Sequence, residues 1–415
     1  MKNKAELLSG FLVLALCCTG LDVGAFFSGQ TISQQENRTL QVKPQFSVQS
    51  YLSGDYFRQW EDYLSDHVPG RALFLQAAET VEQTMAYSGK AASAQIVETT
   101  ADVGVQQGAQ AAQDGTKQEL LVLEDRLLEL YHYDSQACDS YAQAVNAYAD
   151  WLPEQINMYH MLVPMRIAFE KQQYRQLSDN QQQAIGQVYG QLDSRIRTID
   201  VYTRLEQHQA EPVYFRTDHH WTALGAYYGA QAFAEAAGIT LPALEQYEVH
   251  TMSGYLGQLG RNHLTPQLEQ HPEEVVYYVR SGHNNRATMY YYEDGQKKSF
   301  QAPMLNENFN AGKADYGVFI SGDYPYTVVE GDAKNGRVLA VVKDSYGNAL
   351  VPWLAAGYET IVAIDPRTCQ EDLAQLLTQY GVTDFLLLDY VKVTMMEDYS
   401  QMLQQLVTDA VACSN

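Results

Sequence analysis

Apolar positions in residues 118–415 recur with two different periods, which predicts a domain built from both helices and strands. Helical spacing extends over Ser135–Trp151 and Thr222–Ala237, and Gly238 follows the second segment as a helix terminator. Short apolar runs typical of buried strands stand between and after these segments, at 157–165, 338–342 and 384–391. Alternating strands and helices predict a three-layer α/β domain with a mainly parallel sheet over 118–415.

Weaker patterns add further elements to this domain. A hairpin is expected to turn at Asp125-Arg126, and a polar helix to cover about 178–195. Four β-like runs follow within residues 245–335: "EEVVYYV", "ATMYYYE", "YGVFI" and "YTVVE". We therefore expect several additional strands between the second helix and the strand at 338–342.

The first 117 residues differ from the rest in composition. Lys2 and Lys4 precede an uncharged run from Leu7 to Leu21, and about 20 mostly apolar residues can span a bilayer. Residues 1–28 are thus predicted to be a signal anchor or a cleaved signal peptide, with the rest of the chain outside the cytoplasm, at the cell surface. Residues 29–88 predict a helical connector. The Ala/Gln-rich stretch 89–117, which has no aromatic residue, predicts a flexible linker.

Charge and cysteine content exclude some classes of partner and site. The chain has 27 Lys and Arg residues against 50 Asp and Glu residues, a net charge of −23. Such a surface repels a phosphate backbone, so nucleic acid is not expected as a partner. The five cysteines show neither zinc-site spacing nor a disulfide framework. The cysteine pattern therefore predicts no cysteine zinc site and no disulfide scaffold.

The segment "VLAVVKDSYGNAL" places Asp344 and Ser345 at the carboxyl end of a predicted strand, just before a helix. Ligands of open α/β sheets bind at the carboxyl ends of strands. A helix N-terminus supplies unpaired N–H groups and a positive partial charge, which suit a nucleophile and an oxyanion. A simpler interpretation is that Asp344 or Ser345 merely caps the helix.

The segment "YFRTDHHWTALGAYYG" contains the only adjacent histidine pair in the chain. Asp218 and His220 are spaced i, i+2, so the carboxylate of one can reach the imidazole of the other on a loop that enters a helix. Histidine is the usual base for a serine nucleophile, and a carboxylate fixes its tautomer. Two alternatives remain open: Thr217 or Asp218 caps the helix while Trp221 packs in the core, or Asp218, His219 and His220 bind a metal.

Together these segments resemble the DHHW family of bacterial surface proteins, which is similar to the SGNH-hydrolase-like domains of alginate O-acetylation proteins. The resemblance also includes "ENRTLQVKPQFSVQSYLSGDYFRQWEDYLSDHVPGR", "MLVPM", "YGVFISGDYP" and "IVAIDPR". It covers most of the chain beyond residue 30 except the Ala/Gln-rich stretch. It implies an SGNH-hydrolase-like fold in which the Asp and His of a triad precede the Ser in the chain.

The resemblance also implies roles for individual residues. Ser345 corresponds to the nucleophile, His220 to the base and Asp218 to the orienting carboxylate, and the N–H groups of Ser345 and Tyr346 would form part of an oxyanion hole. The remaining oxyanion or substrate-binding candidates are Gly322, Asp323, His219, Trp221 and Asn348. The chain departs from the family pattern at Ser321-Gly322-Asp323, where Gly-Gly-Asn is usual. If that Asn donates to the oxyanion, Asp323 is a poor replacement, because an ionised carboxylate only accepts hydrogen bonds.

The implied function is O-acetyl transfer onto, or removal from, a cell-surface or exported polysaccharide through an acyl-enzyme. A membrane-bound O-acyltransferase would be the partner that supplies acetyl groups, and the implied mechanism needs no metal and no organic cofactor. Two other functions stay open. The departure at Asp323 and the thirty tyrosines favour a non-catalytic glycan-binding or assembly protein on the same fold. The Asp-His-His run would suit a metal-dependent phosphoesterase.

Overall fold

The computed structural model describes residues 32–33, 38–39, 42–47, 50–51, 55–67, 94–100 and 117–413. The chain divides into two compact units, Met1–Ala91 and Ala92–Asn415. The predicted anchor at 1–28 lies outside the described residues, and among those that are described no helix has the length and apolarity needed to cross a membrane.

The described residues of the first unit include the helix α3 (Asp55–Asp66) and a short antiparallel pair, β1 (Ile32–Ser33) with β2 (Arg38–Thr39). Tyr56, Trp60 and Tyr63 recur along one side of α3, and their rings meet edge to face. This helix lies within the predicted helical connector, 29–88.

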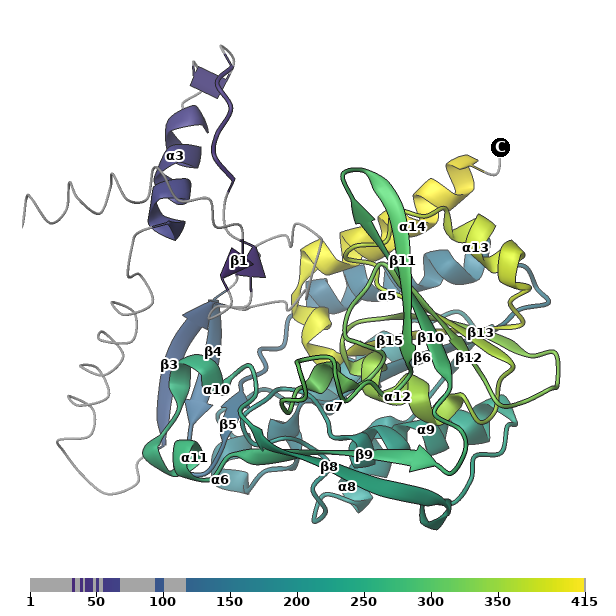
Figure 1. The fold of residues 1–415 in the computed structure, drawn as a ribbon, viewed down its shortest axis with the longest axis horizontal. Coiled ribbons are helices and arrows are strands. Elements are labelled where there is room, and N and C mark those ends of the chain that lie inside the picture. The colour runs from purple at the N-terminus through teal and green to yellow at the C-terminus, as the bar shows by residue number, and fades with distance from the viewer. Residues whose placement is uncertain are drawn as a thin grey trace, which may run out of the picture. The chain divides into compact units, whose positions relative to one another are not determined.

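The second unit is organised around an eight-stranded sheet, drawn in Figure 1. In spatial order its strands are β11 (Gln296–Pro303), β10 (Arg286–Glu293), β12 (Tyr326–Glu330), β14 (Thr360–Ile364), β13 (Val338–Lys343), β15 (Asp384–Tyr390), β6 (Asn157–Val163) and β7 (Ile196–Thr198). The strands from β14 to β7 are parallel, whereas β12, β10 and β11 pair antiparallel. The prediction of a mainly parallel sheet is therefore correct for one half only, and the sheet is mixed.

Helices cover both faces of this sheet, which gives three layers (Figure 1). On one face are α5 (Ser135–Trp151), α7 (Gln181–Tyr189), α13 (Leu373–Tyr380) and α14 (Glu397–Cys413); on the other are α8 (Val201–Gln207), α9 (Ala223–Ala237) and α12 (Tyr346–Leu354). Successive residues of β13 point to opposite faces, so Leu339 and Val341 join one core while Ala340 and Val342 join the other. A strand buried on both faces must be apolar throughout, which explains its uninterrupted hydrophobic run.

Smaller elements surround this sheet. A three-stranded sheet consists of β3 (Gln95–Thr100), β4 (Lys117–Val122) and β5 (Leu127–Glu129), and a ribbon pairs β8 (Tyr247–Tyr255) with β9 (Glu273–Arg280). The short helices are α6 (Gln172–Arg175), α10 (Gly260–His263) and α11 (Pro266–Gln270), with 3₁₀ turns η1 (Arg166–Phe169), η2 (Leu244–Gln246), η3 (Tyr316–Val318) and η4 (Val391–Met395).

Two local predictions are wrong. The stretch 89–117 is not a linker throughout, because β3 lies within it and pairs antiparallel with β4. The run "YGVFI" forms the 3₁₀ turn η3 rather than a strand. The phenyl ring of Phe309 packs so closely on Gly317 that a Cβ at this glycine would lie 2.2 Å from the ring. Ile320, the last residue of the run, and Ser321 have positive φ angles, which end any extended path.

Candidate active site

Ser345 lies where β13 ends and α12 begins, at the carboxyl edge of the parallel half of the sheet. The side chain of the preceding residue, Asp344, holds this turn: Oδ1 accepts from the N–H of Tyr346 at 2.8 Å, and Oδ2 accepts from the N–H of Tyr390 at 2.7 Å. The N-cap position of α12 is Ser345, whose side chain makes no capping hydrogen bond, so Asp344 supports the turn from the residue before the cap. Ser345 itself stays partly exposed at the start of the helix.

The DHHW loop is held against the same edge by contacts on both sides of the motif. Tyr214 forms an isolated bridge with Trp221, and Arg166 Nη1 donates to the carbonyl of Phe215 at 2.6 Å. Thr222, not Thr217 or Asp218, is the N-cap of α9, so the capping alternative is wrong for both residues. The loop is therefore a separate structure placed before the helix.

Asp218, His220 and Ser345 form one hydrogen-bonded chain. His220 Nδ1 lies 2.6 Å from Asp218 Oδ1, and its Nε2 lies 2.7 Å from Ser345 Oγ. Asp218 is 4% exposed and His220 is 5% exposed, so water has little access to the first hydrogen bond. An ionised carboxylate only accepts, so Nδ1 carries the proton that faces Asp218, and Nε2 is left to accept from the serine hydroxyl.

The carboxylate of Asp218 is held ionised by its neighbours. Burial by itself would raise the pKa of Asp218, but the attraction of His220 and its hydrogen bond, followed by His219 and Tyr255, bring the pKa well below 3.8. Oδ2 accepts from the Tyr255 hydroxyl at 2.6 Å and from the N–H of Gln258 at 2.9 Å. The orienting group is thus itself fixed by donors from the β8 end and the loop after it.

Two tyrosines that sequence reasoning missed complete this arrangement. Tyr316 stacks on the His220 ring, with centroids 3.9 Å apart and planes inclined by 11°, and its hydroxyl donates to the Ser345 carbonyl at 3.2 Å. Tyr255 holds Asp218. No local pattern marks either residue among thirty tyrosines, so only the fold identifies them.

Gly257 permits the close approach of the segment that binds Asp218. A Cβ at this position would lie 2.3 Å from Asp218 Cβ and 2.6 Å from the Thr217 carbonyl oxygen. Gly257→Ala is expected to destabilise the protein by about 1–3 kcal/mol through overpacking and to displace Asp218. Urea unfolding measures the loss. Gly186→Ala, in α7 with nothing within 4 Å, is the matched control and should be neutral or stabilising by up to about 1 kcal/mol. Equal effects of the two changes would contradict this role for Gly257.

His219 lies beside the chain of hydrogen bonds but outside it. Its Nδ1 is 3.8 Å from Asp218 Oδ1, and its ring contacts those of His220 and Tyr390. Burial and then repulsion by His220 lower the pKa of His219 to about 4, although Asp218 and Glu129 oppose this. His219 is therefore neutral at physiological pH and borders the site.

The lowered pKa of His219 makes folding depend on pH. The folded state binds this proton only below about pH 4, whereas an unfolded histidine binds it below about 6.5. The unfolded state therefore binds more protons between these values, and stability falls as the pH is lowered. His219→Gln should reduce the loss in unfolding free energy between pH 7 and pH 5 by about 2 kcal/mol, measured by urea unfolding. An unchanged pH dependence would contradict this.

Several predicted oxyanion or substrate-binding residues are engaged elsewhere. The N–H of Tyr346 donates to Asp344, and its hydroxyl donates to the carbonyl of His219, so neither group is available to a ligand. The N–H of Gly322, at φ +82°, donates to the Phe319 carbonyl at 3.0 Å. Trp221 is fully buried, and its Nε1 donates to the Tyr346 carbonyl at 2.9 Å, which makes it a core residue that ties the DHHW loop to α12.

Asp323 and Asn348 belong to a buried charge cluster rather than to the rim of the site. Asp323 Oδ1 accepts from Lys343 Nζ and from Asn348 Nδ2, each at 2.9 Å, and Oδ2 pairs with Arg367 at 3.2 Å. Arg367 also pairs with Asp365 at 2.5 Å. Burial alone would raise the pKa of Asp323, but the two cations lower it. Asp323, the residue that differs from the family pattern, is thus one of two carboxylates that balance two buried cations.

Asp218, His219 and His220 also satisfy a distance test for a metal site, because one potential ligand atom from each lies within 4.8 Å of the others. The donor set fits a metal poorly, however. Both nitrogens of His220 are in hydrogen bonds, and the two oxygens of Asp218 accept from Tyr255 and from the N–H groups of His220 and Gln258. A cation would have to displace these donors.

Comparisons with known proteins agree with the fold and the motifs. A DHHW family protein from Eubacterium siraeum is 26% identical, with 69% of this chain and 95% of that chain covered and a TM-score of 0.59. Bacillus cereus PatB1 is 21% identical, with 67% of this chain and 97% of that chain covered and a TM-score of 0.56. The structure of PatB1 with a sulfonyl adduct is 22% identical, with 67% of this chain and 96% of that chain covered and a TM-score of 0.56. The PatB1 likeness shows the fold alone.

No curated protein matches the sequence. The DHHW protein family, in contrast, matches residues 93–364, which are well over half of the chain. This match includes both the Asp218–Trp221 loop and the Asp344-Ser345 turn. The chain therefore belongs to the DHHW family.

Proposed function

We propose that this chain is a serine-dependent O-acetyltransferase or acetylesterase that acts on a cell-surface or exported polysaccharide. The observation that carries the proposal is the hydrogen-bonded chain from Asp218 through His220 to the partly exposed Ser345. A nucleophile, a base within hydrogen-bond reach and a carboxylate that orients the base are the constellation of acyl transfer. The family resemblance supports acetyl as the group and polysaccharide as the acceptor.

In the first half-reaction His220 Nε2 takes the hydroxyl proton of Ser345 while Oγ attacks the carbonyl carbon of an acetyl ester. The imidazolium is stabilised by Asp218, and it returns the proton to the leaving alcohol as the acetyl-serine forms. In the second half-reaction Nε2 takes a proton from a sugar hydroxyl or from water as its oxygen attacks the acetyl-serine. The imidazolium then returns this proton to Oγ as the bond between the acetyl carbon and Oγ breaks, which regenerates Ser345. Transfer and hydrolysis differ only in this acceptor.

We assign part of the oxyanion site to the N–H of Ser345. Among the described residues this N–H has no backbone or side-chain acceptor, and it lies at the N-terminus of α12, where the helix dipole favours negative charge. Backbone strain lies close by: Ile320 and Ser321 have positive φ angles, and Asp323, two residues on, contacts Lys343 and Asn348 on either side of Ser345 in the chain. Strain of this kind is concentrated at functional sites, which agrees with the proposal.

The proposed location and partner rest on residues 1–28 and on the family resemblance. We infer that these residues anchor the chain, that the second unit lies outside the cytoplasm, and that a membrane-bound O-acyltransferase supplies acetyl groups. Deleting residues 1–28 should release the protein from membranes. Continued sedimentation of the shortened chain with membranes would contradict the anchor.

Covalent capture tests the serine mechanism directly. Phenylmethylsulfonyl fluoride is expected to add one sulfonyl group per chain, located at Ser345 by peptide mass spectrometry, because His220 activates only this hydroxyl. Ser345→Ala should remain unlabelled, and EDTA should leave labelling and acetyl-ester turnover unchanged. A folded protein that is not labelled would favour the glycan-binding alternative. Loss of turnover on chelation would favour the metal-dependent alternative.

A further inference from the structure

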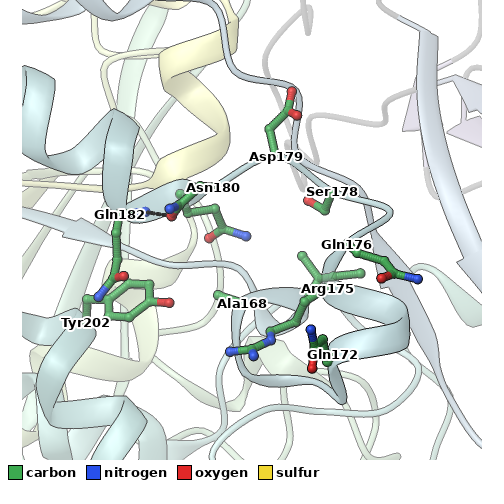
Figure 2. Close-up of a pocket in the computed structure, with 11 residues that line it drawn as sticks. Ala168, Gln172, Arg175, Gln176, Ser178, Asp179, Asn180, Gln182 and Tyr202 are labelled. Carbon is green, nitrogen blue, oxygen red and sulfur yellow. Dashed lines mark hydrogen bonds between the residues drawn. The ribbon is translucent and has the colours of Figure 1, made fainter.

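A pocket lies beside the end of β6, shown in Figure 2. Its volume is about 300 Å³, and its lining comes from η1, α6, the loop after α6, the start of α7 and Tyr202 of α8. Small-molecule sites in proteins begin at about this size. Neither the DHHW loop nor Ser345 lines this pocket, so it is distinct from the proposed catalytic centre.

One residue of the pocket lining, Gln181, is almost fully buried and has a polar atom without a partner among the described residues. Gln181 is 3% exposed, and its Oε1 accepts from the N–H of Met165 at 2.7 Å, while its Nε2 finds no acceptor among the described residues. A buried amide N–H that is left unpaired costs about 1–3 kcal/mol. Because Nε2 is itself closed to solvent, Gln181 fixes Met165 beside the pocket and does not offer this N–H to a ligand that enters it.

The rim of the pocket is polar but carries no net charge. One cation, Arg175, and one anion, Asp179, line it, and the carboxylate of Asp179 already accepts from the N–H of Tyr133 at 2.9 Å. The other polar lining is mainly neutral amides: Gln172, Gln176, Asn180, Gln181 and Gln182. In Figure 2 the hydroxyl of Tyr202 points toward the middle of this lining.

This lining matches the chemistry of a neutral sugar. Amide side chains both donate and accept hydrogen bonds, as sugar hydroxyls do, and an aromatic ring such as that of Tyr202 offers an apolar edge. An anionic ligand is disfavoured, because the single cation is balanced by Asp179 and the chain carries a net charge of −23.

The pocket lies at the same edge of the sheet as the proposed catalytic centre. The strands β6, β15 and β13 are parallel neighbours, so the carboxyl ends of β6 and β13 meet at one edge. Gln181 holds Met165, and the next residue, Arg166, holds the Phe215 carbonyl just before the DHHW loop. A glycan bound along this edge could therefore contact both places.

We propose that this pocket binds a neutral sugar unit of the acceptor polysaccharide, away from the unit that reacts. The assignment rests on the proposed function for its biological meaning, but binding itself needs no chemistry at Ser345. The Tyr202 hydroxyl donates to a sugar oxygen, and the amides of the rim contact the other hydroxyls.

Isothermal titration of the full chain with three neutral probes tests the proposal: cellohexaose, xylohexaose and N-acetylchitohexaose. At least one is expected to bind, and Gln176→Trp, which fills the mouth of the pocket, should weaken this binding at least about tenfold. Tyr202→Phe, which removes only the hydroxyl, should weaken it about 2- to 10-fold. The matched control is Gln404→Trp, at an exposed position of α14, which should bind like wild type.

Three results would overturn the assignment: no binding of any neutral probe, binding that Gln176→Trp leaves unchanged, or binding only of an anionic probe, hexagalacturonate. Ser345→Ala should bind the neutral probe as wild type does. If sulfonyl labelling of Ser345 fails while binding still depends on Gln176, the catalytic proposal is wrong and the sugar site stands. If labelling succeeds and no neutral probe binds, the catalytic proposal stands and the sugar-site proposal is wrong.

Discussion

His220→Ala is expected to lower acetyl-ester turnover by about 10⁴-fold or more, as the loss of a triad base does in serine hydrolases. The physical reason is that, among the described residues, Ser345 Oγ has one acceptor for its proton, His220 Nε2 at 2.7 Å. With alanine at position 220, no base takes the proton of the Ser345 hydroxyl, and a neutral serine hydroxyl is a poor nucleophile. The measurement is hydrolysis of 4-methylumbelliferyl acetate by the full chain, with Ser345→Ala as the reference for complete loss.

His219→Ala is the matched control for this experiment. The two histidines are adjacent, and both are near Asp218, but Nδ1 of His219 is 3.8 Å from the carboxylate, whereas Nδ1 of His220 is 2.6 Å from it. The control should lose no more than about tenfold in turnover, because the hydrogen-bonded chain to Ser345 stays intact. Loss of activity in His219→Ala with activity retained in His220→Ala would overturn the assignment of the base.

Arg367→Met is expected to cost about 3–5 kcal/mol of folding free energy, the loss that follows when one partner of a buried ion pair is removed. The variant leaves two carboxylates, Asp323 and Asp365, with a single cation, Lys343, in a region where all four side chains are at most 6% exposed. Because Lys343 is the last residue of β13, the damage should also spread to Ser345. Urea unfolding followed by circular dichroism measures the loss.

An exposed ion pair provides the comparison for Arg367. Arg204 pairs with Glu235 at 2.6 Å, but these side chains are 27% and 66% exposed, and pairs of this kind contribute about 0–1 kcal/mol. Arg204→Met should therefore change the unfolding free energy by less than about 1 kcal/mol. If both substitutions cost the same, the buried cluster does not have the structural role described above.

Contiguous patterns in the sequence predicted the elements whose cause is local. The helix at Ser135–Trp151 was predicted with the bounds that the structure shows, because its apolar spacing and its end before Pro153 lie within the segment itself. The strand β11, in contrast, was not predicted. Its residues are mostly polar and exposed, and it is a strand because each of them pairs with β10.

The same distinction applies to the candidate site. Asp218, His220 and Ser345 were found because their residue types and spacing within two motifs are informative. Tyr316 and Tyr255 contact these residues from distant segments, and nothing in their own neighbourhoods predicts it. Asp323 was interpreted as an oxyanion or substrate-binding residue for the same reason, because its cationic partner Arg367 lies 44 positions further along the chain.

The order of strands in the large sheet has a consequence for synthesis of the chain. β6 is buried between β7 and β15, but β15 follows it by roughly 220 residues. At about 5–20 residues per second, one edge of this apolar strand stays unpaired for ~10–45 s after it is made. Unpaired apolar edges recruit other chains, so the nascent protein should aggregate when expressed rapidly and benefit from slow induction or a bound chaperone.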